Sequence, residues 1–171
     1  ESCLNSSSPD TDGFIKPEDM MVGGVGAQGR LIPFDGSTYF DGTTDDPAGD
    51  LSSWLEGAID AAGQNGCDRE KHSAGMGYAF HPANASANAG FVRDEGAVLL
   101  LVALTNEADG SPDPWSTYRN YVTDAKSDCG GTSCIQSVGI IDNCVMSFNN
   151  VLYLFLQGVS SAPPLITEAH I

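Results

Sequence analysis

Apolar residues between positions 51 and 62 recur at steps of three and four, which is the period of an amphipathic helix. The apolar positions are Leu51, Trp54, Leu55, Ala58, Ile59 and Ala62. Asp50 stands before the first of them as an N-cap and Gly63 after the last as a stop signal. The pattern therefore predicts a helix over 51–62. A second helix is predicted over about 68–80, although several small residues weaken its propensity.

Residues 97–105 form an unbroken apolar run that is rich in strand-forming residues. Such a run is typical of a strand that is buried on both faces, as in a parallel sheet covered by helices. Two further strands are predicted at 137–142 and 151–159, where short apolar runs are bounded by polar residues.

A helix is predicted between the first two strands, over about 113–126. Asp113 would be its N-cap and Pro114 would occupy the first helical position. The order strand, helix, strand, strand indicates an α/β fold in which a mostly parallel sheet is sandwiched between helices. Residues 1–50 carry four prolines and few apolar runs, so they are expected to form a loop-rich acidic segment packed on the α/β sheet domain of 51–171. One domain overall is expected at this length.

The charge of the chain excludes several classes of partner. Its 171 residues include 23 Asp and Glu against seven Lys and Arg, a net charge of -16. Such a chain repels a nucleic-acid backbone and has no basic segment for an anionic membrane surface. Its apolar runs are too short to cross a bilayer, so no membrane insertion is expected. Hydrophobic residues make up 41%, which is enough for a folded core.

The cysteines favour an oxidising compartment. Cys129 and Cys134 flank a short Gly-Gly-Thr-Ser loop that can close into a disulfide. The pairing of Cys3, Cys67 and Cys144 stays open. The chain is also poor in Lys and starts at Glu1, so we expect a secreted or cell-surface protein, extracellular or periplasmic, rather than a cytosolic one with reduced cysteines.

The loop after the first predicted strand is the best-placed candidate site, because loops at the carboxyl ends of parallel strands carry function in open sheets. It offers oxygen ligands at Thr105, Asn106, Glu107 and Asp109. Hard cations such as Ca²⁺ and Mg²⁺ prefer these ligands. A solvated loop with turn residues and a helix cap is the alternative.

A second candidate cation site lies near the N-terminus. Asp10, Asp12 and Asp19 are spaced like oxygen ligands of a calcium loop, with a glycine at the tight turn. Asp19 stands where a bidentate Glu is usual, and Pro17 interrupts the following helix start. A surface turn explains the same residues more simply.

Other motifs carry little chemistry. The glycines of 24–29 fit a dinucleotide fingerprint by spacing only, because no buried strand precedes them and no helix follows, so no nucleotide is expected. No haem is expected either. Acidic residues of 35–50 could supply paired carboxylates to a hydrolase, but Asp-Gly turns account for them more simply. No nucleophile, base and orienting group occur at a recognisable spacing, so we expect no enzyme.

The stretch 88–109 resembles part of a von Willebrand factor A domain of the bacterial secreted or lipoprotein type. The resemblance rests on Asn88-Ala89-Gly90-Phe91-Val92-Arg93 before an apolar strand that ends in Thr105-Asn106-Glu107-Ala108-Asp109, and on Gly66-Cys67 upstream. It implies a Rossmann-like doubly wound sheet with a divalent cation at its top edge. The sequence departs from the family because it has no Asp-x-Ser-x-Ser motif, and Asn106 stands where the family has Asp. A degenerate metal site is therefore expected.

The first strands of such a domain are also not recognisable, which would leave a sheet edge unpaired. The resemblance thus implies a protein partner, or a missing N-terminal segment, that completes the sheet; a homo-oligomer or filament would satisfy the same edge. The function expected is a non-catalytic adhesion or binding module, cation-dependent if the site is occupied. The alternative is a structural subunit of an extracellular assembly, and a hydrolase using 35–50 is the third hypothesis.

Overall fold

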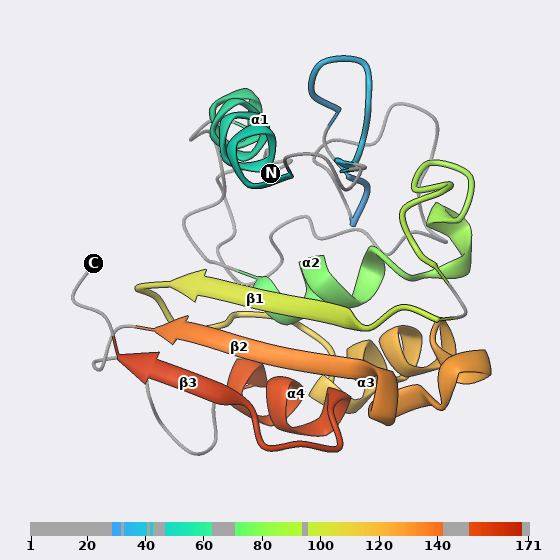
Figure 1. Ribbon diagram of the computed structural model, residues 1–171. Helices are drawn as coiled ribbons and strands as arrows, with labels where there is room; N and C mark the ends of the chain where they lie inside the picture. The colour runs from blue at the N-terminus through green and yellow to red at the C-terminus, as the bar shows by residue number, and fades with distance from the viewer. Residues whose placement is uncertain are drawn as a thin grey trace, which may run out of the picture.

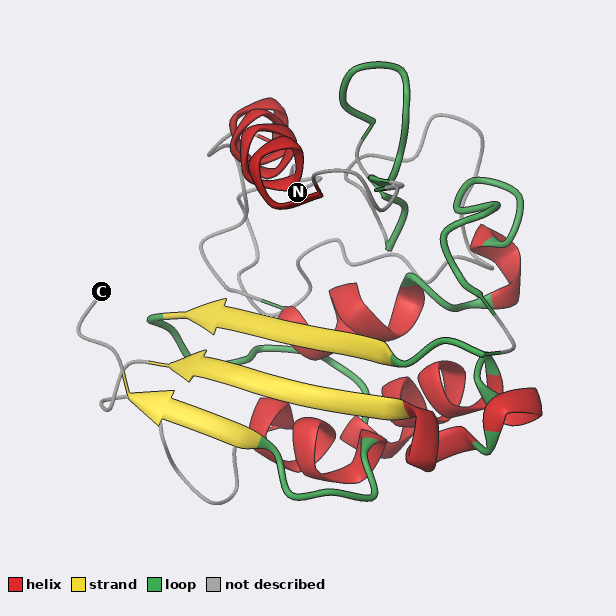
Figure 2. Ribbon diagram, viewed as in Figure 1, coloured by secondary structure: helices red, strands yellow, loops and turns green. Residues whose placement is uncertain are grey.

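The protein is an α/β fold built on a three-stranded parallel sheet (Figures 1 and 2). The computed structural model describes residues 29–31, 33–40, 42, 47–62, 71–93, 96–141 and 151–168. Most of the segment 1–50 lies outside these ranges. No helix among the described residues has the length and apolarity needed to cross a membrane.

The sheet has the order β1-β2-β3, in which β1 is Leu99–Thr105, β2 is Ile135–Ile141 and β3 is Leu165–Glu168. Leu99 pairs with Ile135, and the register then continues along both strands. Each crossover is a helix: α3 (Trp115–Asp124) links β1 to β2, and α4 (Val151–Val159) links β2 to β3. The predicted strand-helix-strand unit is confirmed, and a second one follows it.

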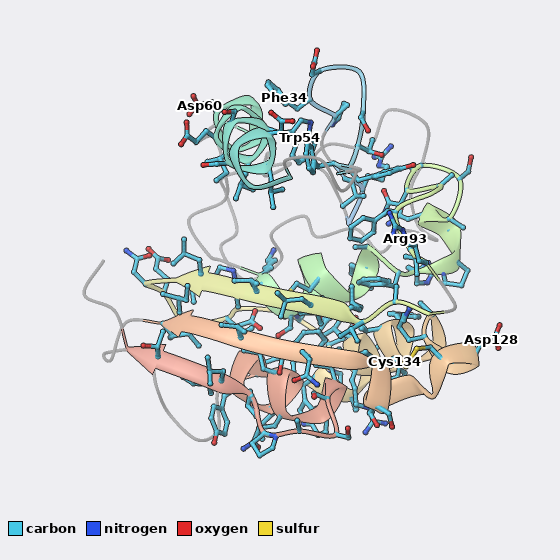
Figure 3. All side chains as sticks on the ribbon, viewed as in Figure 1. Phe34, Trp54, Asp60, Arg93, Asp128 and Cys134 are labelled. Carbon is cyan, nitrogen blue, oxygen red and sulfur yellow. A yellow bond between two sulfur atoms is a disulfide. The ribbon has the colours of Figure 1, made fainter. Side chains whose placement is uncertain are left out.

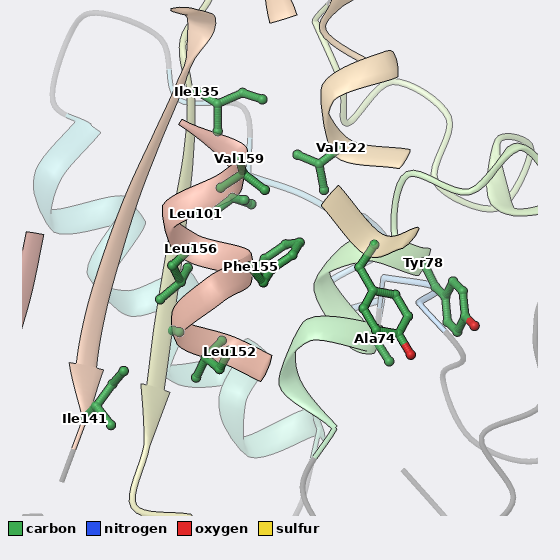
Figure 4. Packing of buried hydrophobic residues seen from close by; sticks show 12 residues of the cluster. Ala74, Tyr78, Leu101, Val122, Ile135, Ile141, Leu152, Phe155, Leu156 and Val159 are labelled. Carbon is green, nitrogen blue, oxygen red and sulfur yellow. The ribbon is translucent and has the colours of Figure 1, made fainter. Parts of the chain in front are cut away.

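Helices α2 (His72–Tyr78), α3 and α4 pack together on one face of the sheet and form the core (Figure 4). The large side chains buried there are Tyr78, Tyr118, Val122, Ile135, Leu152, Phe155, Leu156 and Val159. Gly77 allows the close approach of α2 and α3, because a Cβ at this position would lie 2.5 Å from the Cβ of Tyr118. Two buried serines join α4 to β2. The Ser137 hydroxyl donates to the carbonyl of Leu156 (2.9 Å), and the Ser160 hydroxyl donates to the carbonyl of Ile135 (2.7 Å).

The predicted strand at 151–159 is wrong, because these residues form α4. The run is apolar at almost every position, so it lacks the alternation that separates a strand from a helix. Its buried residues are Leu152, Phe155, Leu156 and Val159, at the steps of three and four that a helix requires. The strand that was not predicted, β3, has only four residues and follows two prolines.

The prediction that the first strand is buried on both faces is also wrong. Residues of β1 alternate: Leu101, Ala103 and Thr105 are buried beneath the helices, whereas Leu100, Val102 and Leu104 are 52–61% exposed. Among the described residues, α2, α3 and α4 cover one face of the sheet and leave the other open. The α/β class is confirmed, and the sandwich is not shown by these residues.

The boundaries of three helices differ from the predictions. The first helix, α1, spans Pro47–Ala62, so Asp50 lies in its first turn instead of capping it. The second, α2, covers only seven residues of the predicted 68–80 span, and residues 63–70 lie outside the described part. In α3 the N-cap is Pro114, not Asp113, because Pro114 itself is extended (ψ 139°) and the helix begins only at Trp115. The helix ends at Asp124, two residues before Lys126.

A tight turn and a disulfide hold two exposed parts of the fold. Asp35 (φ 48°) and Gly36 (φ 76°) form the turn between Phe34 and Ser37, whose backbones exchange two hydrogen bonds, as in a type I′ hairpin. The predicted disulfide between Cys129 and Cys134 is present, with a Cα–Cα distance of 5.9 Å.

Candidate functional site

The loop after β1 lies at the carboxyl edge of the sheet, as predicted, and it holds the first turn of α2. The hydroxyl of Thr105 accepts from the backbone N–H of Glu107 (2.9 Å) and donates to its carbonyl (3.0 Å), which folds the loop back on itself. Thr105 is 5% exposed, so its hydroxyl is largely withdrawn from solvent. Asn106 and Glu107 are exposed on the outer side of this turn.

Asp109 caps α2 from a distance of more than thirty residues in sequence. Its Oδ2 accepts from the backbone N–H of Ser73 (3.2 Å) and from the Ser73 hydroxyl, and its Oδ1 accepts from the N–H (3.0 Å) and hydroxyl (2.6 Å) of Ser111. The Ser111 hydroxyl in turn accepts from the N–H of Ala74 (2.9 Å). Two orphan amides at the start of α2 are thereby satisfied.

This arrangement bears on the metal hypothesis. A carboxylate offers about four lone-pair positions, and Asp109 already accepts four hydrogen bonds. A cation would have to displace N–H and O–H donors that stabilise α2. No group of three or more His, Cys, Asp or Glu side chains suited to a metal occurs among the described residues. Asp10, Asp12 and Asp19 lie outside those residues.

Asp113 joins a buried pair of tyrosines to the same loop. Its carboxylate accepts from the Tyr78 hydroxyl (2.8 Å), and its N–H donates to the Tyr118 oxygen (2.8 Å). The two rings pack edge to face with centroids 5.4 Å apart. Burial is the main reason that the pKa of Tyr78 is raised, and the hydrogen bond to Asp113 adds to it; burial also raises the pKa of Tyr118. Both hydroxyls stay protonated at neutral pH.

The polar residues at this edge bind one another and the start of α2. Ser73 is fully buried, and its hydroxyl donates to Asp109. The Nε2 atom of the neighbouring His72 is buried without a hydrogen-bond partner. Of the acidic residues at 35–50, Asp35 belongs to the hairpin turn and Asp50 lies in the first turn of α1. Asp41, Asp45 and Asp46 lie outside the described residues. The edge therefore serves to fix α2 against the sheet.

In the sequence, Asn88 stands out only as part of the stretch that resembles a von Willebrand factor A domain, whereas in the structure it joins two distant parts of the chain. It is 5% exposed, its amide donates to the carbonyls of Gly29 (2.9 Å) and Ala79 (2.8 Å), and its Oδ1 accepts from the N–H of Leu31 (2.9 Å). Asn88 thus clamps the segment around Arg30 to the end of α2. A single asparagine in a stretch of small residues does not indicate that its side chain binds Leu31 and Gly29, which lie 57 and 59 positions away in the sequence.

The open face of the sheet is the other feature that sequence reasoning missed. It presents Leu100, Val102, Leu104 and Leu165, which are 52–70% exposed, beside the half-buried Val138 and Ile140. The register places Val102 beside Val138 and Val138 beside Leu165, so these side chains form one apolar surface across three strands. We call it the open sheet face.

No protein-family model, no curated protein and no solved structure matches this chain.

Proposed function

We propose that the chain is a non-catalytic binding module that takes a protein segment against the β1 edge and the open sheet face. The observation that carries the proposal is that the sheet has one uncovered apolar face and ends at β1 among the described residues. The segment would come from another chain or from a further part of the same polypeptide. The disulfide supports an extracellular or cell-surface location, because such bonds persist in oxidising compartments.

The β1 edge is unusually suited to strand addition. Its seven residues include no charged residue and no proline, whereas natural edge strands are commonly protected by both. β1 pairs with β2 on one side only, and the described residues place no strand on the other. A strand added there would supply backbone hydrogen bonds along the edge.

Side-chain burial alone would not hold a partner. Fully burying a Leu or Val contributes about 1.5–3 kcal/mol, so covering four half-exposed side chains would contribute about 3–6 kcal/mol. Association costs at least about 4 kcal/mol, and micromolar binding needs about 8 kcal/mol net. The partner must therefore pair with the backbone of β1 as well as cover the open sheet face.

The same edge supports the alternative function, a structural subunit of an extracellular assembly. Two uncharged β1 edges could pair with each other and give a dimer, whereas pairing of β1 with the β3 edge of another copy would give a filament. Sedimentation over a range of protein concentrations separates the two functions: a monomer at all concentrations favours the binding module, and concentration-dependent association favours the subunit.

The proposal is tested with a labelled peptide that copies residues 135–141 between flanking lysines, because β2 is the neighbour that already fits β1. We expect saturable binding, with new protection from hydrogen exchange at alternate amides of β1. Val102→Lys puts a charge in the centre of the edge and should abolish binding. Gln157→Lys adds the same charge on the exposed side of α4 and should not. Equal binding by both variants, or no protection in β1, would refute the proposal.

A further inference from the structure

Helix α1 lies apart from the helices of the core. Figure 1 shows it beyond the β1 edge of the sheet, whereas α2, α3 and α4 pack together. A groove of about 750 Å³ separates α1 from the start of β1, and its lining includes Leu55 of α1 and Leu100 of β1. Helix α1 therefore lies near the open sheet face but leaves the side chains of that face exposed.

One side of α1 carries an apolar stripe that is also exposed. The stripe consists of Leu51, Leu55 and Ile59, which follow one another at steps of four and are 45–62% exposed. A helix of this pattern normally turns its stripe toward a core. The chain thus holds two exposed apolar surfaces, the stripe and the open sheet face, at the same groove.

Contacts from another side of the helix hold α1 where it is. The rings of Phe34 and Phe40 both lie 6.0 Å from the ring of Trp54, measured between centroids, and Figure 3 labels Phe34 close to Trp54. Phe34 also fills the space beside Gly57, where an added Cβ would lie 2.1 Å from its ring. These contacts do not use the stripe, so they do not bury it.

The stripe and the open sheet face have matching dimensions. From Leu51 to Ile59 the helix rises about 12 Å, at about 1.5 Å per residue. From Leu100 to Leu104 the strand rises about 13 Å, at about 3.3 Å per residue, and the three strands span about 10 Å from side to side. The stripe can therefore cover the apolar side chains of the sheet, whether it lies along the strands or across them.

We propose that α1 closes onto the open sheet face, where its stripe packs against Leu100, Val102 and Leu104, and that the closed state excludes the partner segment. The exclusion rests on the proposed function, whereas the closure itself does not. In the closed state helices cover both faces of the sheet, as the sequence predicted.

The occupant of the open sheet face is α1, not a separate helix, because the two are parts of one chain. Side-chain burial alone is too weak to hold a separate chain, which loses translational and rotational freedom when it associates. Closure of α1 is intramolecular and does not carry that cost. A partner that also pairs with the backbone of β1 gains hydrogen bonds that a helix cannot make, so it can displace α1.

Disulfide trapping tests the closure. The pair Leu55→Cys and Val102→Cys joins the stripe to a position outside the groove lining, and a disulfide needs Cα atoms within about 7 Å. We expect oxidised glutathione to link residues 55 and 102, as identified by mass spectrometry of proteolytic fragments. The control pair, Ser53→Cys and Val102→Cys, carries its first thiol on the opposite side of α1 and should link at least tenfold more slowly. Equal rates, or no link, would overturn the proposal.

The labelled peptide that copies residues 135–141 tests the exclusion. Leu55→Asp changes an exposed side chain, so it should fold normally, and its charge disfavours the closed state. We expect it to bind the peptide at least threefold more tightly, because a larger fraction of the molecules is open. Ser53→Asp adds the same charge on the opposite side of α1 and should not change the affinity, which controls for attraction to the lysines of the peptide.

The linked protein gives the second measurement of exclusion. With residues 55 and 102 joined, it should not bind the peptide, and dithiothreitol should restore binding. The unmodified protein in the same reductant controls for opening of the disulfide between Cys129 and Cys134. Binding by the linked protein, or equal affinity of Leu55→Asp and the unmodified protein, would overturn the exclusion. Linkage of 55 to 102 without peptide binding by any variant would confirm closure and refute the proposed function instead.

Discussion

Replacing Asn88 tests whether one side chain holds the segment 29–31 against the end of α2. Asn88→Ala removes three hydrogen bonds, to the Gly29 carbonyl, the Ala79 carbonyl and the Leu31 N–H. A typical intramolecular hydrogen bond contributes about 1 kcal/mol net, so we expect a loss of about 3 kcal/mol in the free energy of unfolding. For a chain of this length that corresponds to a fall in Tm of about 6–12 °C.

Asn88→Asp removes only the two hydrogen bonds that the side-chain amide donates, whereas Asn88→Ala removes all three. The aspartate keeps an acceptor for Leu31 but turns a carboxylate toward two carbonyl oxygens. It should be more destabilising than Asn88→Ala at neutral pH, and the difference should shrink as the pH falls and the carboxyl becomes protonated. At an exposed site, where water solvates a carboxylate, an aspartate is not expected to be more destabilising than an alanine.

Thermal and urea unfolding followed by circular dichroism measure both variants, and Asn106→Ala is the matched control because Asn106 is exposed. We expect the control to lie within about 0.5 kcal/mol of the unmodified protein. The reasoning fails if Asn88→Ala behaves like the control, or if Asn88→Asp is the milder change at neutral pH.

Three further predictions concern the core and the disulfide. Gly77→Ala should destabilise the protein by about 1–3 kcal/mol, because the added Cβ would overlap Tyr118. Gly75→Ala in the same helix meets no atom within 4 Å and should stabilise the protein by up to about 1 kcal/mol. Chemical denaturation ranks the two variants, and the reverse order would contradict the packing of α2 on α3. Above pH 10 the unfolded chain releases tyrosine protons that the native state retains at Tyr78 and Tyr118, because their pKa values are raised. Their stabilisation is therefore complete below pH 10, and the free energy of unfolding should fall above it by about 1.4 kcal/mol per pH unit for each tyrosine. Tyr78→Phe should halve that slope, and an unchanged slope would mean that Tyr78 ionises equally in both states. Reducing the disulfide opens a short loop and should lower the free energy of unfolding by about 2 kcal/mol, which is measured as a fall in Tm with dithiothreitol. Replacing both cysteines by serine should abolish the effect of the reductant. A residual effect would indicate another reducible bond.

The sequence determined the elements whose signals are local. The three- and four-residue spacing after Leu51 predicted α1, and the apolar run before Thr105 predicted β1. The spacing of Cys129 and Cys134 predicted their disulfide, because only four residues separate them. Each of these signals is complete within a short stretch, so no distant partner is needed to read it.

Tertiary packing decided what an apolar run becomes and which faces it covers. Residues 151–159 are apolar enough for a strand or a helix, and they form α4 because the crossover between two parallel strands needs a helix to pack on the sheet. The exposure of Leu100, Val102 and Leu104 likewise depends on which elements cover the sheet. The sequence of β1 does not say which elements these are.

The candidate site shows the same division. The sequence alone identified Thr105, Asn106, Glu107 and Asp109 as an oxygen-rich loop at the carboxyl end of a strand. Only the tertiary structure placed the first turn of α2 against that loop, where the N–H and hydroxyl of Ser73 donate to Oδ2 of Asp109, while Ser111 of the loop itself donates to Oδ1. A carboxylate binds whichever donors are brought to it, and here folding brings amides and hydroxyls. The chain's local sequence thus fixed which groups the loop offers, and long-range packing fixed what they bind.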